Sequence, residues 1–200
     1  MYTFESPSGL PTLNHCRFEK GRRMSLSEAE FANLRQTIAM RGTVRILLLP
    51  VTLVGWSLLA GALVLFNDLP VGALLSLAVL IGGFESIHAL HVGVERIGRY
   101  IQVFYEGSAD GPHWETTAMS VGPSLPGGGI DPLFTVVFAS ATFANLIPAL
   151  LPQPVPLELG VVGAFHVAFF IRLIRARGAA ARQRAVELET FRALKAGAVR

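Results

Sequence analysis

From Ile46 onward, long apolar stretches alternate with short turns rich in Pro, Asn and Asp. The first stretch, 46–66, runs for 21 residues without a charged side chain. A helix rises about 1.5 Å per residue, so about 20 apolar residues cross a hydrocarbon core about 30 Å thick. The pattern predicts an all-α, polytopic membrane protein with four transmembrane helices in two hairpins, at about 46–66, 70–91, 132–151 and 156–174.

The second apolar stretch changes character within one helix. Its uncharged part, from Val71 to Phe84, is 14 residues long and covers only about 21 Å, so the span has to include ionisable residues. At 100° per residue, a polar stripe then continues along one helix face: Glu85, His88, His91, Glu95, Arg99, Gln102 and Glu106. Because ionisable groups are costly at membrane depth, we expect this stripe to face protein or a polar cavity instead of lipid.

The segments outside the spans complete the predicted organisation. Residues 1–24 lack periodicity and predict a flexible arm. Residues 25–42 begin with a capping box and predict an amphipathic interfacial helix that stops near Arg41-Gly42. The transmembrane domain covers 43–175 and includes a Gly/Pro-rich loop at 107–131, and residues 176–200 predict a basic C-terminal helix.

The distribution of charge predicts the orientation. Charged residues make up 16% of the chain, and none of the 17 Lys and Arg falls in either short turn between paired spans. The positive-inside rule therefore places both termini and the loop 107–131 in the cytoplasm, as extensions of a bacterial-type inner-membrane protein. Lys and Arg beside apolar segments suit lipid headgroups, and no nucleic-acid motif accompanies them. The lone Cys16 excludes an internal disulfide.

The polar stripe admits two chemical interpretations. Glu85 and Arg172 lie at matching depths below their turns, about 22 and 24 Å, which predicts an ion pair between the second and fourth spans. Alternatively, Glu85, His88, His91 and Glu95 carry ligand types that Zn or Fe accepts. A di-iron site needs a second Glu-x-x-His element, which only a homodimer would supply.

Two more polar residues fall at membrane depth. Asn145 on the third span and His166 on the fourth lie near the same level, which predicts a hydrogen bond between the two helices. The alternative is that His166 ligates haem or relays protons. His88 lies about 12 Å deeper, which disfavours a bis-His haem within one chain.

No catalytic triad or nucleotide-binding pattern appears, so an enzyme is not the favoured interpretation. The first hypothesis is a non-enzymatic scaffold or accessory subunit, without a cofactor, that partners another membrane protein. The second is an oligomeric transporter or channel-like protein with the stripe along a polar path. The third is a metal-dependent membrane enzyme. Small residues at Gly160, Ala164 and Ala168 would permit self-association.

Overall fold

The computed structural model describes residues 26–66, 69–106, 113–121 and 132–197. These ranges form helices and turns without a strand, which confirms the predicted all-α class. The helices are α1 (Leu26–Phe66), the 3₁₀ helix η1 (Pro70–Gly72), α2 (Ala73–Phe104), α3 (Trp114–Val121), α4 (Pro132–Ala144), α5 (Ile147–Leu150) and α6 (Pro156–Lys195).

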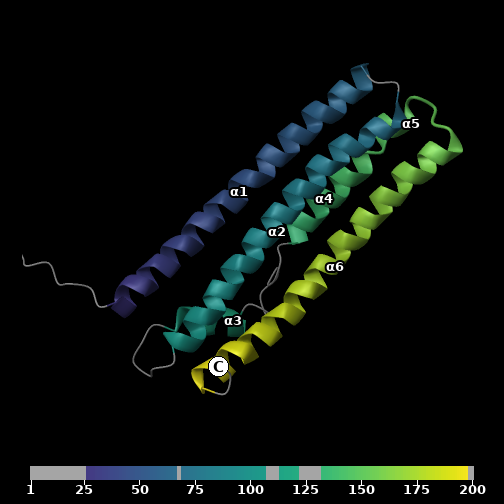
Figure 1. Ribbon diagram of the computed structural model, residues 1–200. Helices are drawn as coiled ribbons and strands as arrows, with labels where there is room; N and C mark the ends of the chain where they lie inside the picture. The colour runs from purple at the N-terminus through teal and green to yellow at the C-terminus, as the bar shows by residue number, and fades with distance from the viewer. Residues whose placement is uncertain (1–25, 67–68, 107–112, 122–131, 198–200) are drawn as a thin grey trace, which may run out of the picture.

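The long helices lie side by side along one axis, with α2 in contact with both α1 and α6 (Figure 1). Helices α2 and α6 run parallel, while α1 and α4 run in the opposite direction. One end of the molecule carries the start of α2 and the start of α6, where the short turns lead in, and the other carries the start of α1, helix α3 and the end of α6. Both predicted hairpins therefore point the same way.

Three helices are long and apolar enough to cross a membrane, and they contain three of the four predicted spans. The third predicted span is different, because the apolar segment Phe134–Leu150 is shorter and is interrupted between α4 and α5. Pro148 explains the interruption: it has no N–H to donate, and its ring clashes with the carbonyl four residues earlier, at Ala144. Helix α4 ends at Ala144, close to the kink predicted near Pro148.

Helix α1 does not stop near Arg41-Gly42, which corrects the sequence prediction of a separate helix over 25–42. A glycine inside a helix costs only about 1 kcal/mol, and packing on α2 offsets that cost. The first part of α1 contacts the far end of α2, where the ring centroids of Phe31 and Tyr105 lie 5.3 Å apart. The predicted arm 1–24 and most of the loop 107–131 lie outside the described residues.

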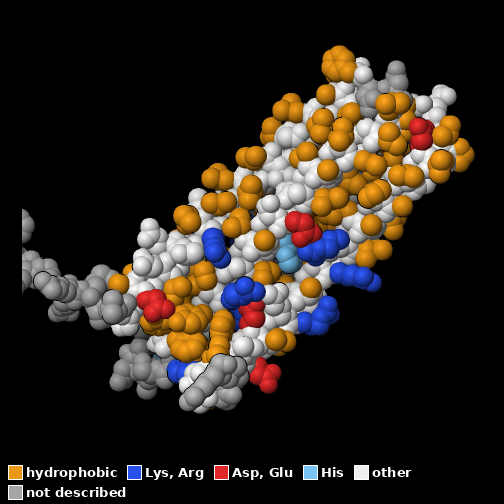
Figure 2. Space-filling model, viewed as in Figure 1, with side chains coloured by type: hydrophobic (Ala, Val, Ile, Leu, Met, Phe, Trp, Pro, Cys, Tyr) orange, Lys and Arg blue, Asp and Glu red, His pale blue; other side chains and the backbone are white. Residues whose placement is uncertain are grey.

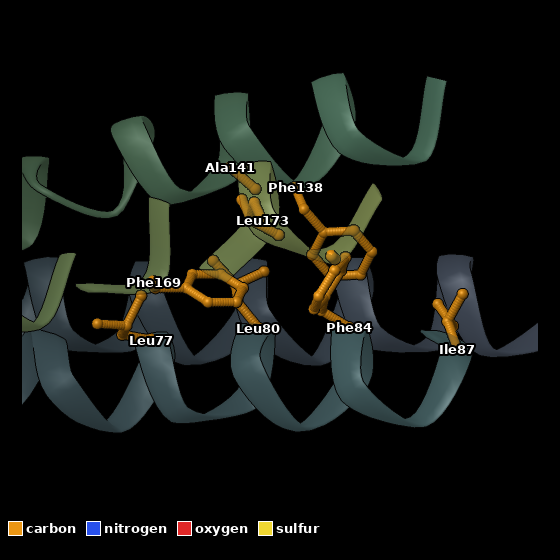
Figure 3. Packing of buried hydrophobic residues seen from close by; sticks show 9 residues of the cluster. Leu77, Leu80, Phe84, Ile87, Phe138, Ala141, Phe169 and Leu173 are labelled. Carbon is orange, nitrogen blue, oxygen red and sulfur yellow. The ribbon is translucent and has the colours of Figure 1, made fainter. Parts of the chain in front are cut away.

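Close approach of α1 to α2 depends on Gly83. A Cβ atom at that position would lie 2.1 Å from Cγ2 of Thr52, whose side chain is buried between the helices. On the other face of α2, Phe84 packs edge-on against Phe138 of α4 and Phe169 of α6 (Figure 3). These contacts make α2 the central helix of the apolar core.

The surface divides along the long axis (Figure 2). Apolar side chains cover the end that carries the short turns, whereas Lys, Arg, Asp and Glu gather toward the opposite end. Most exposed large apolar side chains of α1 lie in the predicted span: Ile46, Leu47, Val51, Val54, Leu58, Val64, Leu65 and Phe66. Such a surface suits contact with lipid, because water would leave these side chains unfavourably hydrated.

Candidate functional site

The polar stripe of α2 is joined to α6 by ion pairs. Arg172 donates from Nη2 to Oε2 of Glu85 at 2.7 Å, so the pair predicted from equal depth is confirmed. The guanidinium of Arg172 also lies over the ring of Phe84, 5.7 Å from its centroid. The ring and the carboxylate together hold this arginine against α2.

A second ion-pair cluster follows further along the same two helices. Arg99, whose side chain is 1% exposed, donates from Nε to Oε2 of Glu187 at 3.0 Å. Arg96 donates to the other carboxylate oxygen of Glu187 at 2.8 Å. On the α2 side, Glu95 accepts hydrogen bonds from Arg184 and from Arg99. The residue numbers of the partners increase together along α2 and α6, as they must when two parallel helices are paired.

The last member of the stripe, Glu106, holds the start of α3. Its two carboxylate oxygens accept hydrogen bonds from the backbone N–H groups of Glu115 and Thr116, both at 2.7 Å. A carboxylate at a helix N-terminus satisfies orphan N–H groups and complements the helix dipole. Arg35 of α1 donates to the Glu115 side chain at 2.8 Å. Burial raises the pKa of Glu115, and the Arg35 guanidinium opposes that rise.

The two histidines of the stripe have different surroundings. Arg45 of α1 donates from Nη1 to Nδ1 of His91 at 2.8 Å, which places the His91 proton on Nε2. That Nε2 lies 3.6 Å from Oε1 of Glu95, beyond hydrogen-bonding distance. His88 packs against Phe84, with ring centroids 5.9 Å apart. Both Nε2 atoms are buried and lack a hydrogen-bond partner within the described part of the chain.

The four residues proposed as metal ligands do not converge in one chain. Among the described residues, no group of three or more His, Cys, Asp or Glu side chains is arranged to hold a metal ion. Glu85 is paired with Arg172, whereas His91 and Glu95 lie together beside Arg45 and Arg184. Two guanidinium groups at this point oppose a divalent cation by electrostatic repulsion. The metal site stays a prediction that requires a second subunit or a rearrangement.

A buried amide joins four segments nearer the turn end. Asn145, fully buried, donates from Nδ2 to Nε2 of His166 at 3.1 Å, which confirms the predicted contact between the two helices. The same Nδ2 donates to the Ala73 carbonyl at 2.9 Å. Oδ1 accepts from Trp56 Nε1 at 2.9 Å and from Ser76 Oγ at 2.6 Å. Every hydrogen-bonding position of the amide is occupied.

The hydrogen bonds of His166 bear on its proposed haem chemistry. Its Nδ1 donates to the Val162 carbonyl at 2.8 Å, so Nε2 is the acceptor for Asn145. Binding of haem iron at Nε2 would therefore break the contact with Asn145. The geometry favours a structural role for His166 in holding α6 to the rest of the bundle.

Sequence reasoning missed Trp56, Ser76, Arg45 and Glu187 as partners in these networks. An indole N–H within an apolar span usually needs an acceptor when buried, so Trp56 carried a usable signal. Arg45 directly precedes the uncharged stretch 46–66, and Glu187 lies two residues before Glu189, so nothing local identifies the partner of either.

Protein-family models give no match to this chain, and neither the curated proteins nor the solved structures yield a similar protein. Function is therefore argued from the chemistry of these networks.

Proposed function

We propose that this protein is a four-span integral membrane scaffold whose helical extension docks another protein on the cytoplasmic side. The proposal rests on one observation: side chains of the polar stripe on α2 are hydrogen-bonded to α6. These side chains are Glu85, Glu95 and Arg99. Ion pairs of this kind fix the helices to one another, which suits a rigid support. A transporter path along the stripe would require these bonds to open.

Helices α2 and α6 are longer than the hydrocarbon core is thick, so both extend beyond it. Helix α2 has 32 residues and α6 has 40, which correspond to about 48 and 60 Å against a hydrocarbon core of about 30 Å. Beyond the core, Phe191 of α6 packs edge-on against Tyr100 of α2, with centroids 5.8 Å apart. Phe104 adds a further contact with Phe191 at 6.4 Å. The extension is thus a packed continuation of the bundle.

Apolar side chains on the extension provide a surface for a partner. Trp114 of α3 is 64% exposed, Val186 of α6 is 62% exposed and Met40 of α1 is 62% exposed. Aromatic residues and Met are enriched in protein interfaces, so this exposed Trp and Met suit contact with a partner.

The proposed topology places α4 and α5 together as the third, interrupted span, with both termini in the cytoplasm. In a Cys16→Ser background, a cysteine at Gln153 is expected to react with a membrane-impermeant thiol reagent added to intact cells, because that turn carries no Lys or Arg. A cysteine at Ser120 is the matched control and is expected to react only after the membrane is opened. Labelling at Ser120 in intact cells, or protection at Gln153, would reject this topology.

Docking is tested by purification in mild detergent. The unaltered protein is expected to retain a partner at stoichiometric level, and the double change Trp114→Ser with Val186→Ser is expected to release it. Leu151→Ser, an equally exposed apolar side chain at the turn end, is the control and is expected to retain the partner. Absence of any stoichiometric partner from the unaltered protein, or equal loss with Leu151→Ser, would contradict the scaffold proposal.

A metal-dependent enzyme is the second candidate, since His88 and His91 each present a buried Nε2 without a partner in the described ranges. Elemental analysis of protein purified without chelator separates the two candidates. Near-stoichiometric Zn or Fe that disappears with His91→Ala would favour the enzyme, and only trace metal would remove it.

A further inference from the structure

A continuous row of polar side chains crosses the molecule from α1 through α2 to α6. Arg45 of α1 donates to His91 of α2, and His91 Nε2 lies 3.6 Å from the Glu95 carboxylate. Glu95 in turn accepts a hydrogen bond from Arg184 of α6. The row brings two guanidinium groups and one imidazole around a single carboxylate, so positive charge exceeds negative charge.

Three N–H donors in this row have no acceptor among the described residues. They are Nε of Arg45, Nε2 of His91 and Nε of Arg184, and all three atoms are buried. A buried donor without an acceptor is costly, and the cost is greater for a charged group. All three unmet groups are donors, since the Arg45 bond places the His91 proton on Nε2. The row is therefore suited to a ligand that offers several acceptor oxygens and negative charge.

The row opens to the surface through its arginines. The Arg184 side chain is 33% exposed and Arg45 is half-buried, whereas the His91 side chain is only 14% exposed. An anion therefore reaches the row at the outer parts of the two guanidinium groups.

The position of the row along the helices indicates the source of the anion. His91 lies 21 residues after Pro70, and Arg45 lies 21 residues before Phe66, which places both about 31 Å from the turn end. That distance equals the thickness of the hydrocarbon core, so Arg45 and His91 lie at the level of the inner headgroups. Arg184 lies 28 residues after Pro156, about 42 Å from the turn end, on the outer side of this level. Basic pockets between membrane helices on the cytoplasmic side bind anionic lipid headgroups.

We propose that Arg45, His91 and Arg184 bind the phosphate of an anionic phospholipid from the cytoplasmic leaflet. The phosphate oxygens accept hydrogen bonds from the exposed parts of the two guanidinium groups, and Glu95 orients Arg184 from the side facing α2. The assignment to the inner leaflet rests on the topology of the proposed function. Binding itself requires neither that topology nor a docked partner, so its test is independent of both.

The test is a lipid titration of the purified full chain in dodecyl maltoside, followed by native mass spectrometry and thermal unfolding. Dioleoyl phosphatidylglycerol is expected to bind and raise the unfolding temperature, whereas dioleoyl phosphatidylcholine and inorganic phosphate at the same concentration are not. Arg45→Gln is expected to weaken phosphatidylglycerol binding about tenfold, the effect of losing one charged hydrogen bond. Arg182→Gln, an exposed arginine of α6 with the same change in charge, is expected to change binding less than about twofold.

A second variant guards against misfolding of Arg45→Gln. Arg184→Gln removes the guanidinium on α6 instead, and it is expected to weaken phosphatidylglycerol binding as Arg45→Gln does while the helical content is unchanged. Equal weakening by Arg182→Gln would show diffuse attraction and overturn the site. Equal binding of phosphatidylcholine would overturn the requirement for an anionic lipid, and saturation by inorganic phosphate alone would overturn the lipid as the source. Unchanged binding in both Arg45→Gln and Arg184→Gln would also overturn the proposal.

Discussion

Replacing Glu187 with alanine is expected to lower the free energy of unfolding by about 3–5 kcal/mol, the effect of breaking a buried ion pair by removing one partner. The change leaves the guanidinium of Arg99, which is 1% exposed, without its closest carboxylate. Glu95 cannot substitute fully, because it lies 3.4 Å from Arg99 and is shared with Arg184. The expected loss therefore falls at the lower end of that range.

The measurement is equilibrium unfolding in mixed micelles, followed by far-UV circular dichroism. Glu189→Ala is the matched control, because this exposed carboxylate lies two residues further along α6, and its loss is expected to cost less than about 0.5 kcal/mol. Replacing both Arg99 and Glu187 by leucine is expected to recover most of the stability, since no buried charge is left without a partner and Arg96 is 55% exposed. A Glu187→Ala protein as stable as Glu189→Ala would contradict a structural role for this pair.

The sequence predicted the contacts of the site that follow from the depth of each residue below its turn. Residues at equal distances from two turns must meet if the helices are adjacent, and that argument found both Glu85 with Arg172 and Asn145 with His166. Depth gives no rotational information, however. It could not indicate that Arg45 of α1 turns toward His91, since either face of α1 was compatible with the sequence.

The errors in the fold arose where local signals compete with packing. Gly42 weakens a helix locally, yet contacts of α1 with α2 and α3 on both sides of it keep the helix continuous. Pro148 marked the interruption of the predicted third span, but its steric effect acts four residues earlier. The break therefore appears at Asn145–Leu146, and the Asn145 side chain makes its four hydrogen bonds from this break.

Asn145→Leu is expected to lower the free energy of unfolding by about 2–3 kcal/mol. The side chain makes four hydrogen bonds to other segments, and bonds of this kind within membrane proteins average about 0.6 kcal/mol each. Leucine has nearly the same volume, so the loss reflects hydrogen bonding more than a cavity. Ser57→Ala is the control, because that hydroxyl donates only to the carbonyl of Val54 within its own helix.

A double-mutant cycle distinguishes loss of the Asn145 hydrogen bonds from a general packing defect. Trp56→Phe removes only the indole donor, and on its own it leaves Asn145 Oδ1 with Ser76 as the remaining donor. In the Asn145→Leu background the acceptor is already gone, so Trp56→Phe is expected to cost less than it does alone. Strictly additive effects in mixed-micelle unfolding would show that the two side chains act independently. That result would contradict a role for the Asn145 amide in joining α1 to α6 through the core of the bundle.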